Sequence, residues 1–316
     1  MRFNPKARLD TGRVRDRGRG GGGGFGRGGG SMGGARMPIP GGMRAGGGIG
    51  GVIVVVLFLV LTQCVGGGVP GLGGGSSSAY DTSRFAGSDR YENCRTGEDA
   101  NDDVDCARVA VENSLHDFWS DELGDRFRPV EQLATFSGST QTGCGGATSD
   151  VGPFYCPGDS SIYLDTTFFD AVLERQLGGP SGGFVEPYVL AHEYGHHIQN
   201  LLDTMSRVRT QQGPTSDAVR LELQADCYAG MWARAATSTE DADGNVLISE
   251  LTRQDVEEAV AAAGAVGDDR IQEKTQGQVT EESWTHGSAE MRVRWFETGF
   301  DSGSLDACDT FAADRL

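Results

Sequence analysis

The feature that most constrains this chain is the motif HEYGH at residues 192–196, in which two histidines stand four residues apart and a glutamate follows the first. On an α-helix, positions i and i+4 lie one above the other, so His192 and His196 can direct their imidazoles at one point and hold one Zn²⁺ ion. Glu193 lies about a hundred degrees further round the helix. From there its carboxylate can reach a water on the metal without becoming a ligand. The motif therefore predicts a helix that carries a metal site.

The residues around the motif predict a buried helix over residues 187–205. Pro187 suits the first helical turn, where a backbone N–H has no partner in any case. Apolar residues recur at helical spacing on both sides of the motif: Val189, Leu190, Ile198, Leu201, Leu202 and Met205. Three histidines on a buried helix are expected to have a specific role there. His197 points about a hundred degrees away from His196, which leaves it a secondary alternative as a ligand.

A second helix, predicted over residues 217–236, offers a third metal ligand. Glu222 and Asp226 are four residues apart in it, so their carboxylates lie on one face. Catalytic zinc sites have three protein ligands and an open fourth position, whereas structural sites have four protein ligands. On these grounds either Glu222 or Asp226 could complete the set, since both face the metal.

Four stretches together resemble a known protein family: HEYGHHIQ (192–199), ELQADCYAGMWA (222–233), GDDRIQ (267–272) and THGSAEMRVRWFETGF (285–300). They are similar to the bacterial membrane-anchored neutral zinc metallopeptidases, and the similarity covers roughly residues 80–311. The resemblance implies a gluzincin-like peptidase in which His192, His196 and Glu222 bind zinc and Glu193 is the catalytic carboxylate. It also implies that Asp226 accepts a hydrogen bond from the far nitrogen of a ligand histidine and so fixes its tautomer.

Peptide hydrolysis at zinc commonly needs a further donor for the oxyanion of the tetrahedral intermediate. His286, in a helix predicted over residues 281–300, is the candidate. Arg292 and Arg294 on the same helix are alternatives, and an ordinary surface histidine is the competing interpretation of His286.

The pattern of elements predicts an α+β fold, namely a zincin-like, mostly helical domain with a small antiparallel sheet. Further helices are expected over residues 105–119, 166–176 and 252–263, and strands over residues 127–136 and 161–165. The strand at 161–165 precedes the metal-site helix, so it could be the edge along which an extended peptide binds; an ordinary structural strand is the equal alternative.

The charges are distributed unevenly along the chain, whose formal net charge is −18. Residues 1–48 contain ten Lys/Arg and only two Asp, and they include a Gly/Arg-rich run at 17–30. Such a tail cannot bury apolar surface and is expected to be disordered. An RNA-binding role for the tail is the weaker alternative to attraction by anionic lipid head groups. The rest of the chain is strongly acidic, which argues against nucleic acid as its partner.

Residues 49–65 (IGGVIVVVLFLVLTQCV) carry no charge and predict one transmembrane helix. Positive charge precedes this segment and acidic residues follow it, so the expected protein is a single-pass protein of the cell membrane with a cytoplasmic amino terminus. Alternatives are a cleaved signal peptide and, more weakly, lipid attachment at Cys64. Residues 66–79 predict a Gly/Ser linker, and residues 80–316 predict the exported zinc metallopeptidase domain.

Six cysteines follow the apolar segment: Cys94, Cys106, Cys144, Cys156, Cys227 and Cys308. An even number outside the cell favours disulfides, for which fifteen connectivities exist. Two local loops of equal spacing favour Cys94–Cys106 and Cys144–Cys156, which leaves Cys227–Cys308. A thiolate metal site is the weaker alternative, because no CxxC spacing occurs.

Two functions from different classes compete. The first is a zinc peptidase, in which a metal-activated water attacks a peptide bond while Glu193 acts as general base and then as general acid. The second is a non-catalytic, zinc-stabilised binding or scaffold module of the cell envelope. Glu193 argues against the second, because a structural site has no use for a base beside the metal.

Overall fold

The computed structural model describes residues 1–19 and 89–316, apart from positions 176 and 181. Its largest sheet has four strands in the order β2 (Val14–Arg19), β3 (Gln132–Ser137), β7 (Ser161–Asp165) and β6 (Phe154–Cys156). Strand β2 runs parallel to β3 and β3 runs parallel to β7, whereas only β6 is antiparallel to its neighbour. The prediction of an antiparallel sheet is therefore wrong for two of the three pairings. Between β3 and β7 the chain forms the hairpin of β4 (Ser139–Thr142) and β5 (Gly145–Thr148) and then β6. These strands reverse the chain direction, so that β7 runs parallel to β3.

Strand β7 lies inside the sheet, between β3 and β6, and its five residues are buried. Of the two alternatives for residues 161–165, the ordinary structural strand is confirmed and the peptide-binding edge is wrong, because both sides of this strand are already paired. The edge strand on that side of the sheet is β6.

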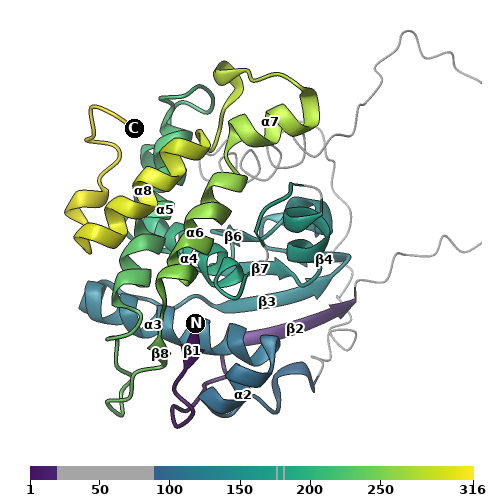
Figure 1. Ribbon diagram of the computed structural model, residues 1–316, viewed down its shortest axis with the longest axis vertical. Coiled ribbons are helices and arrows are strands. Elements are labelled where there is room, and N and C mark those ends of the chain that lie inside the picture. Colours follow the sequence, from purple (N-terminus) through teal and green to yellow (C-terminus); the bar gives the residue numbers. More distant parts are fainter. Residues whose placement is uncertain (20–88, 176, 181) are drawn as a thin grey trace, which may run out of the picture.

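Residues 1–19 belong to the folded body. Strand β1 (Arg2–Phe3) pairs with β8 (Ile248–Glu250), and β2 joins the main sheet (Figure 1). The predicted disordered tail over residues 1–48 is thus wrong for residues 1–19. The prediction relied on the average composition of residues 1–48 and so overlooked two apolar residues. Phe3 and Val14 are 4% and 3% exposed and pack into the core. The predicted transmembrane segment 49–65 and linker 66–79 lie outside the described residues.

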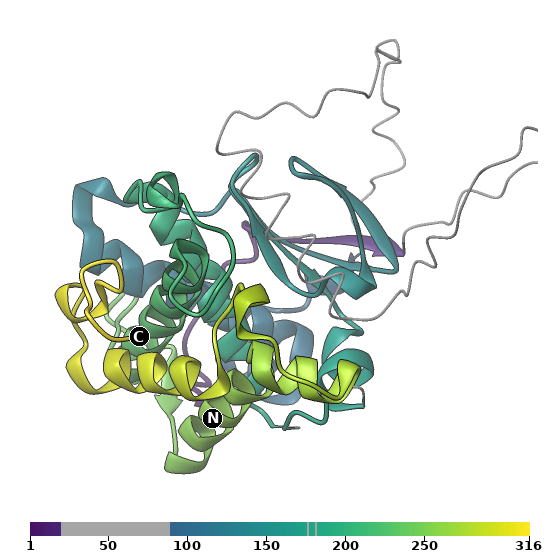
Figure 2. The same ribbon diagram turned by 90° about the horizontal axis from the view of Figure 1, so that it is seen from above.

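Helices form the larger part of the fold, as the α+β prediction requires, and gather to one side of the main sheet (Figure 2). They are α2 (Gly97–Asp102), α3 (Val104–Leu123), α4 (Val185–Leu201), α5 (Asp217–Ala235), α6 (Arg253–Ala265), α7 (Asp268–Gln276) and α8 (Ala289–Ser302). A π-helical turn, Phe169–Glu174, replaces the α-helix predicted over residues 166–176. Among the described residues, no helix combines the length and apolar character that crossing a membrane requires.

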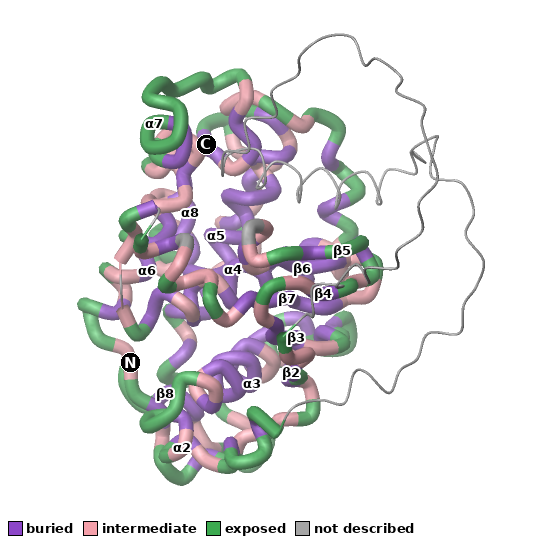
Figure 3. The backbone as a smooth tube through the Cα atoms, turned by 90° about the vertical axis from the view of Figure 1, so that its right-hand side faces the viewer, coloured by how far each residue is buried: buried purple, intermediate pink, exposed green. Residues whose placement is uncertain are grey.

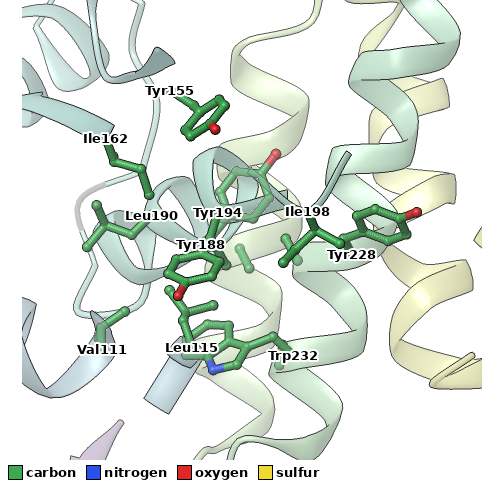
Figure 4. Packing of buried hydrophobic residues seen from close by; sticks show 14 of the residues in the cluster. Val111, Leu115, Tyr155, Ile162, Tyr188, Leu190, Tyr194, Ile198, Tyr228 and Trp232 are labelled. Atoms are coloured by element: carbon green, nitrogen blue, oxygen red, sulfur yellow. The ribbon is translucent and has the colours of Figure 1, made fainter. Parts of the chain in front are cut away.

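The core lies where α3, α4 and α5 meet the sheet (Figure 4). Helices α4 and α5 are buried along most of their length (Figure 3). Close contact between α5 and α8 depends on small residues, since a Cβ atom at Gly299 would stand 1.8 Å from the carbonyl oxygen of Cys227.

The three predicted disulfides, Cys94–Cys106, Cys144–Cys156 and Cys227–Cys308, are confirmed. The third joins α5 to the 3₁₀ turn Asp306–Cys308 near the end of the chain.

Candidate metal centre

Helix α4 holds His192, Glu193 and His196 at a buried position, where they are 6%, 8% and 9% exposed. The two imidazole centroids lie 4.8 Å apart, as expected for positions i and i+4. Gly195 between them lets α4 approach α5 closely, because a Cβ atom there would lie 3.1 Å from the carbonyl oxygen of Ala225. The motif thus brings its histidines up against the next helix.

Helix α5 contributes Glu222, which is 2% exposed. One carboxylate oxygen lies 3.2 Å from Nε2 of His192, and the other lies 3.4 Å from Nε2 of His196. One ligand atom from each of these three residues falls within 4.8 Å of the others. In a tetrahedral zinc site with bonds of about 2.0–2.1 Å, neighbouring ligand atoms stand roughly 3.3 Å apart. The spacing of the donors therefore suits a zinc ion.

The far nitrogen of each histidine has its own acceptor. Nδ1 of His192 lies 2.8 Å from Oδ1 of Asp226, and Nδ1 of His196 lies 2.8 Å from Oε1 of Gln199. These acceptors favour the ring proton on Nδ1, so Nε2 of each ring, which faces Glu222, is the nitrogen available to a metal ion. Asp226 is therefore occupied behind His192 rather than facing the metal position. The geometry favours Glu222 over Asp226 as the third ligand.

Asp226 is a fully buried carboxylate with three partners. Besides His192 it accepts a hydrogen bond from the Tyr188 hydroxyl at 2.6 Å and two from the guanidinium of Arg292, at 2.8 and 2.9 Å. Burial would raise the pKa of Asp226, but Arg292 and His192 lower it to about 2. The carboxylate is therefore ionised at neutral pH.

Glu193 lies beside the three candidate ligands and does not join them. Its Oε2 accepts a hydrogen bond of 2.8 Å from the backbone N–H of Tyr155, in the edge strand β6. Burial raises the pKa of Glu193 above the ordinary value, although the two nearby histidines oppose this. The sheet thus fixes one oxygen of a buried carboxylate next to the metal position.

His286 lies in the segment before α8, because this helix begins only at Ala289 and not at residue 281 as predicted. Its Nδ1 lies 2.8 Å from the Thr285 hydroxyl and 3.4 Å from Oδ1 of Asp268. Burial would lower the pKa of His286, but Glu222 and Asp268 raise it. Both carboxylates therefore favour the charged form of the His286 ring.

Residues 1–311 match the family described as "putative neutral zinc metallopeptidase". The chain belongs to this family. The match includes strands β1 and β2, which the resemblance seen in the sequence motifs did not reach.

Two relatives illustrate the similarity. The uncharacterized protein Rv2575 of Mycobacterium tuberculosis (strain H37Rv) is 50% identical over 225 residues, which is 71% of this chain and 76% of the relative. The uncharacterized protein YpfJ of Escherichia coli (strain K12) is 40% identical over 206 residues, or 63% of this chain and 68% of the relative. No solved structure matches the chain.

In this zinc metallopeptidase family member, three residues considered as alternatives have other partners. His197 contacts the carbonyl oxygen of Arg128 through Nε2 at 2.7 Å and the Tyr155 hydroxyl through Nδ1 at 3.1 Å, which makes it a structural tie. Arg292 is bound to Asp226. Arg294 donates to the carbonyl oxygen of Leu316 and to Glu290. Neither arginine is therefore free to serve as the oxyanion donor.

The sequence prediction missed several residues around this candidate metal centre. Gln199 stands three residues after His196, so its position on the same helical face was a usable signal. Tyr155 acts through its backbone amide, which residue type does not reveal. Tyr188 and the role of Arg292 follow only from the packing of α4, α5 and α8.

Proposed function

We propose that this chain is a zinc-dependent peptidase that hydrolyses peptide bonds in peptides or proteins. One observation carries the proposal: a buried carboxylate, Glu193, stands beside His192, His196 and Glu222 without belonging to the ligand set. Burying a carboxylate is unfavourable unless it is paired or hydrogen-bonded, and the structure provides the amide of Tyr155 to one oxygen of Glu193. A purely structural zinc site would need no such group, so the non-catalytic scaffold is the less favoured function.

The donors fit zinc, because two imidazoles and one carboxylate leave a fourth position open. A zinc ion held there would act as a Lewis acid and lower the pKa of water to near 7. In this proposal Glu193 takes a proton from the attacking water and delivers it to the leaving amine. Its raised pKa brings this proton transfer closer to neutral pH. In this proposal His286 donates a hydrogen bond to the carbonyl oxygen as negative charge develops on it.

The test is a broad peptide-library assay of the full chain, with and without a chelator. Cleavage is expected in the zinc-loaded protein and not after chelation. Glu193→Gln should bind zinc normally and lose at least about 100-fold in rate, because the proton carrier is removed.

Glu186→Gln is the matched control, since Glu186 lies on the same helix and pairs with Arg108 away from the centre. This variant should keep its activity. Undiminished hydrolysis by Glu193→Gln would refute the assigned role, and a zinc-loaded wild type that cleaves no peptide would favour the scaffold.

A further inference from the structure

Arg292 is a buried cation that the proposed reaction does not use. It is 4% exposed, and it comes from α8, one hundred residues after His192. We propose that Arg292 is a positioning residue for His192, acting through Asp226, and that it strengthens zinc binding. The inference rests on the proposed function only in taking zinc as the metal.

Arg292 holds both oxygens of Asp226. Its Nε lies 2.8 Å from Oδ2, and its Nη2 lies 2.9 Å from Oδ1. Such a two-point contact fixes the plane of the carboxylate as well as its position. Nη1 donates to the carbonyl oxygen of Val266 at 3.3 Å, which in turn anchors the guanidinium. The orientation of Asp226 is therefore set from α8.

The same carboxylate orients the ligand. Oδ1 of Asp226 accepts the Nδ1–H of His192 while it is held by Arg292. Without Arg292, nothing on α8 fixes the plane of the Asp226 carboxylate, and the unpaired buried charge favours its turning away. The His192 ring would then lose its orienting partner, and disturbing such an outer partner typically lowers metal affinity 10–100-fold.

A simple charge effect would act in the opposite direction. Arg292 is positive, so its removal would by Coulomb's law make the centre more attractive to Zn²⁺. Weaker zinc binding after the loss of Arg292 can therefore be assigned to lost orientation of Asp226 and His192. The direction of the change separates the two explanations.

The experiment measures the zinc dissociation constant of the full chain by competition with a chelator. Arg292→Met should weaken binding about 10–100-fold. Arg108→Met is the matched control, because Arg108 is 6% exposed and pairs with Glu186 on α4, away from the metal position. It removes a similarly buried cation and should leave the zinc affinity unchanged.

A double variant shows whether Arg292 acts through Asp226. The double variant Asp226→Asn/Arg292→Met should bind zinc with the same affinity as Asp226→Asn alone. If Arg292→Met alone does not fold, the double variant still allows the test, because it contains no unpaired buried charge. Wild-type affinity in Arg292→Met, or an equal loss in Arg108→Met, would overturn the inference. Failure of the wild type to bind zinc would instead count against the proposed function.

A second inference is carried independently by strands β1 and β2. We infer that residues 1–19 fold in the same compartment as the disulfide-bonded residues 89–316. The chain between them would then begin and end on one side of any membrane, unlike the single-pass orientation that the charge pattern predicts.

Specific bonds join the two parts. The amide of Leu9 donates to the carbonyl of Arg95, and the amide of Gly97 donates to the carbonyl of Ala7, next to the Cys94–Cys106 disulfide. Nε of Arg13 donates to Glu112 at 2.7 Å, and β2 pairs with β3. A membrane between the two parts would break every one of these contacts.

The test uses single cysteines in the full chain, with Cys64, which belongs to none of the three disulfides, replaced by Ser. Lys6→Cys and Glu282→Cys place one thiol at an exposed position in each part. Intact cells are treated with a membrane-impermeant maleimide and compared with lysed cells. Equal labelling of both thiols before lysis, or equal protection of both, supports one compartment. Labelling of only one thiol before lysis would overturn the inference.

Discussion

Each histidine of the centre uses its two ring nitrogens differently. Nε2 of His192 and of His196 faces Glu222, while Nδ1 is held by Asp226 or Gln199. Gln199 is itself fixed, because its amide donates to the carbonyl oxygen of Leu221 at 2.7 Å. The candidate ligands are therefore pre-oriented by outer contacts, which would reduce the ordering that metal binding requires.

The protonation of a single residue, His286, predicts how the activity depends on pH. A neutral imidazole carries one proton, and Asp268 favours it on Nδ1, so Nε2 can donate only in the charged ring. Because the pKa of His286 is raised, this donor is present below the raised value and is lost as the pH increases through it. His286→Gln should lower kcat about 10²–10³-fold and remove the corresponding alkaline fall from the pH profile.

His116→Gln is the control for that profile, since His116 lies on α3 and contacts Asp117. It should leave both kcat and the pH profile unchanged. An alkaline fall that persists in His286→Gln would contradict the assignment.

At the scale of elements, the centre depends on how closely α4, α5 and α8 pack. Helix α5 carries Glu222 and Asp226, and α8 reaches it through Gly230 and Gly299, where added Cβ atoms would lie 2.1 Å and 1.8 Å from backbone oxygens. Backbone atoms cannot move aside as a flexible side chain can. A shift of α8 would carry Arg292 away from Asp226.

Gly299→Ala should therefore destabilise the protein by about 3 kcal/mol or more, because the new methyl group forces two helices apart. Gly264→Ala on α6 is the control, since its Cβ would make only ordinary side-chain contacts, with Val293 at 3.6 Å and Ala289 at 4.0 Å. It should be neutral or stabilise by up to about 1 kcal/mol through better helix propensity. Urea unfolding measures both; equal effects of the two variants would rule out the packing explanation.

The disulfides give a second prediction for elements. Cys227–Cys308 closes a separation of 81 residues and Cys94–Cys106 one of 12. Loop-closure entropy predicts that loss of the former costs about 4.5 kcal/mol and loss of the latter about 3 kcal/mol. Replacing each pair by serines and measuring urea unfolding compares them. A larger loss from the short loop would contradict this ordering.

For the whole molecule, the participation of residues 1–19 in the fold is the main departure from expectation. Val14→Asp would bury a charge in β2 and should destabilise the protein by several kcal/mol. Arg15→Asp, at the exposed neighbouring position, should change stability by no more than about 0.5 kcal/mol. Thermal unfolding tests this pair, and equal melting temperatures would mean that β2 is not part of the stable fold.

The local features of this molecule could be predicted from its sequence, and the long-range ones could not. Helical spacing located the HEYGH helix and the carboxylates of α5, and cysteine spacing located the two local disulfides, which left Cys227–Cys308 by exclusion. Strand β2 was not predicted, because its pairing partner, β3, lies more than a hundred residues away in the sequence. The amide of Tyr155 and the pairing of Arg292 with Asp226 depend on the packing of distant elements, which periodicity does not encode.

The zinc stoichiometry and affinity of the purified full chain, compared between the wild type, Glu222→Gln and Glu193→Gln, decide whether the ligand set is correct. One zinc ion per chain is predicted for the wild type and for Glu193→Gln, with similar affinities, and much weaker binding is predicted for Glu222→Gln. Zinc binding by Glu222→Gln as tight as that of the wild type would contradict the proposed centre.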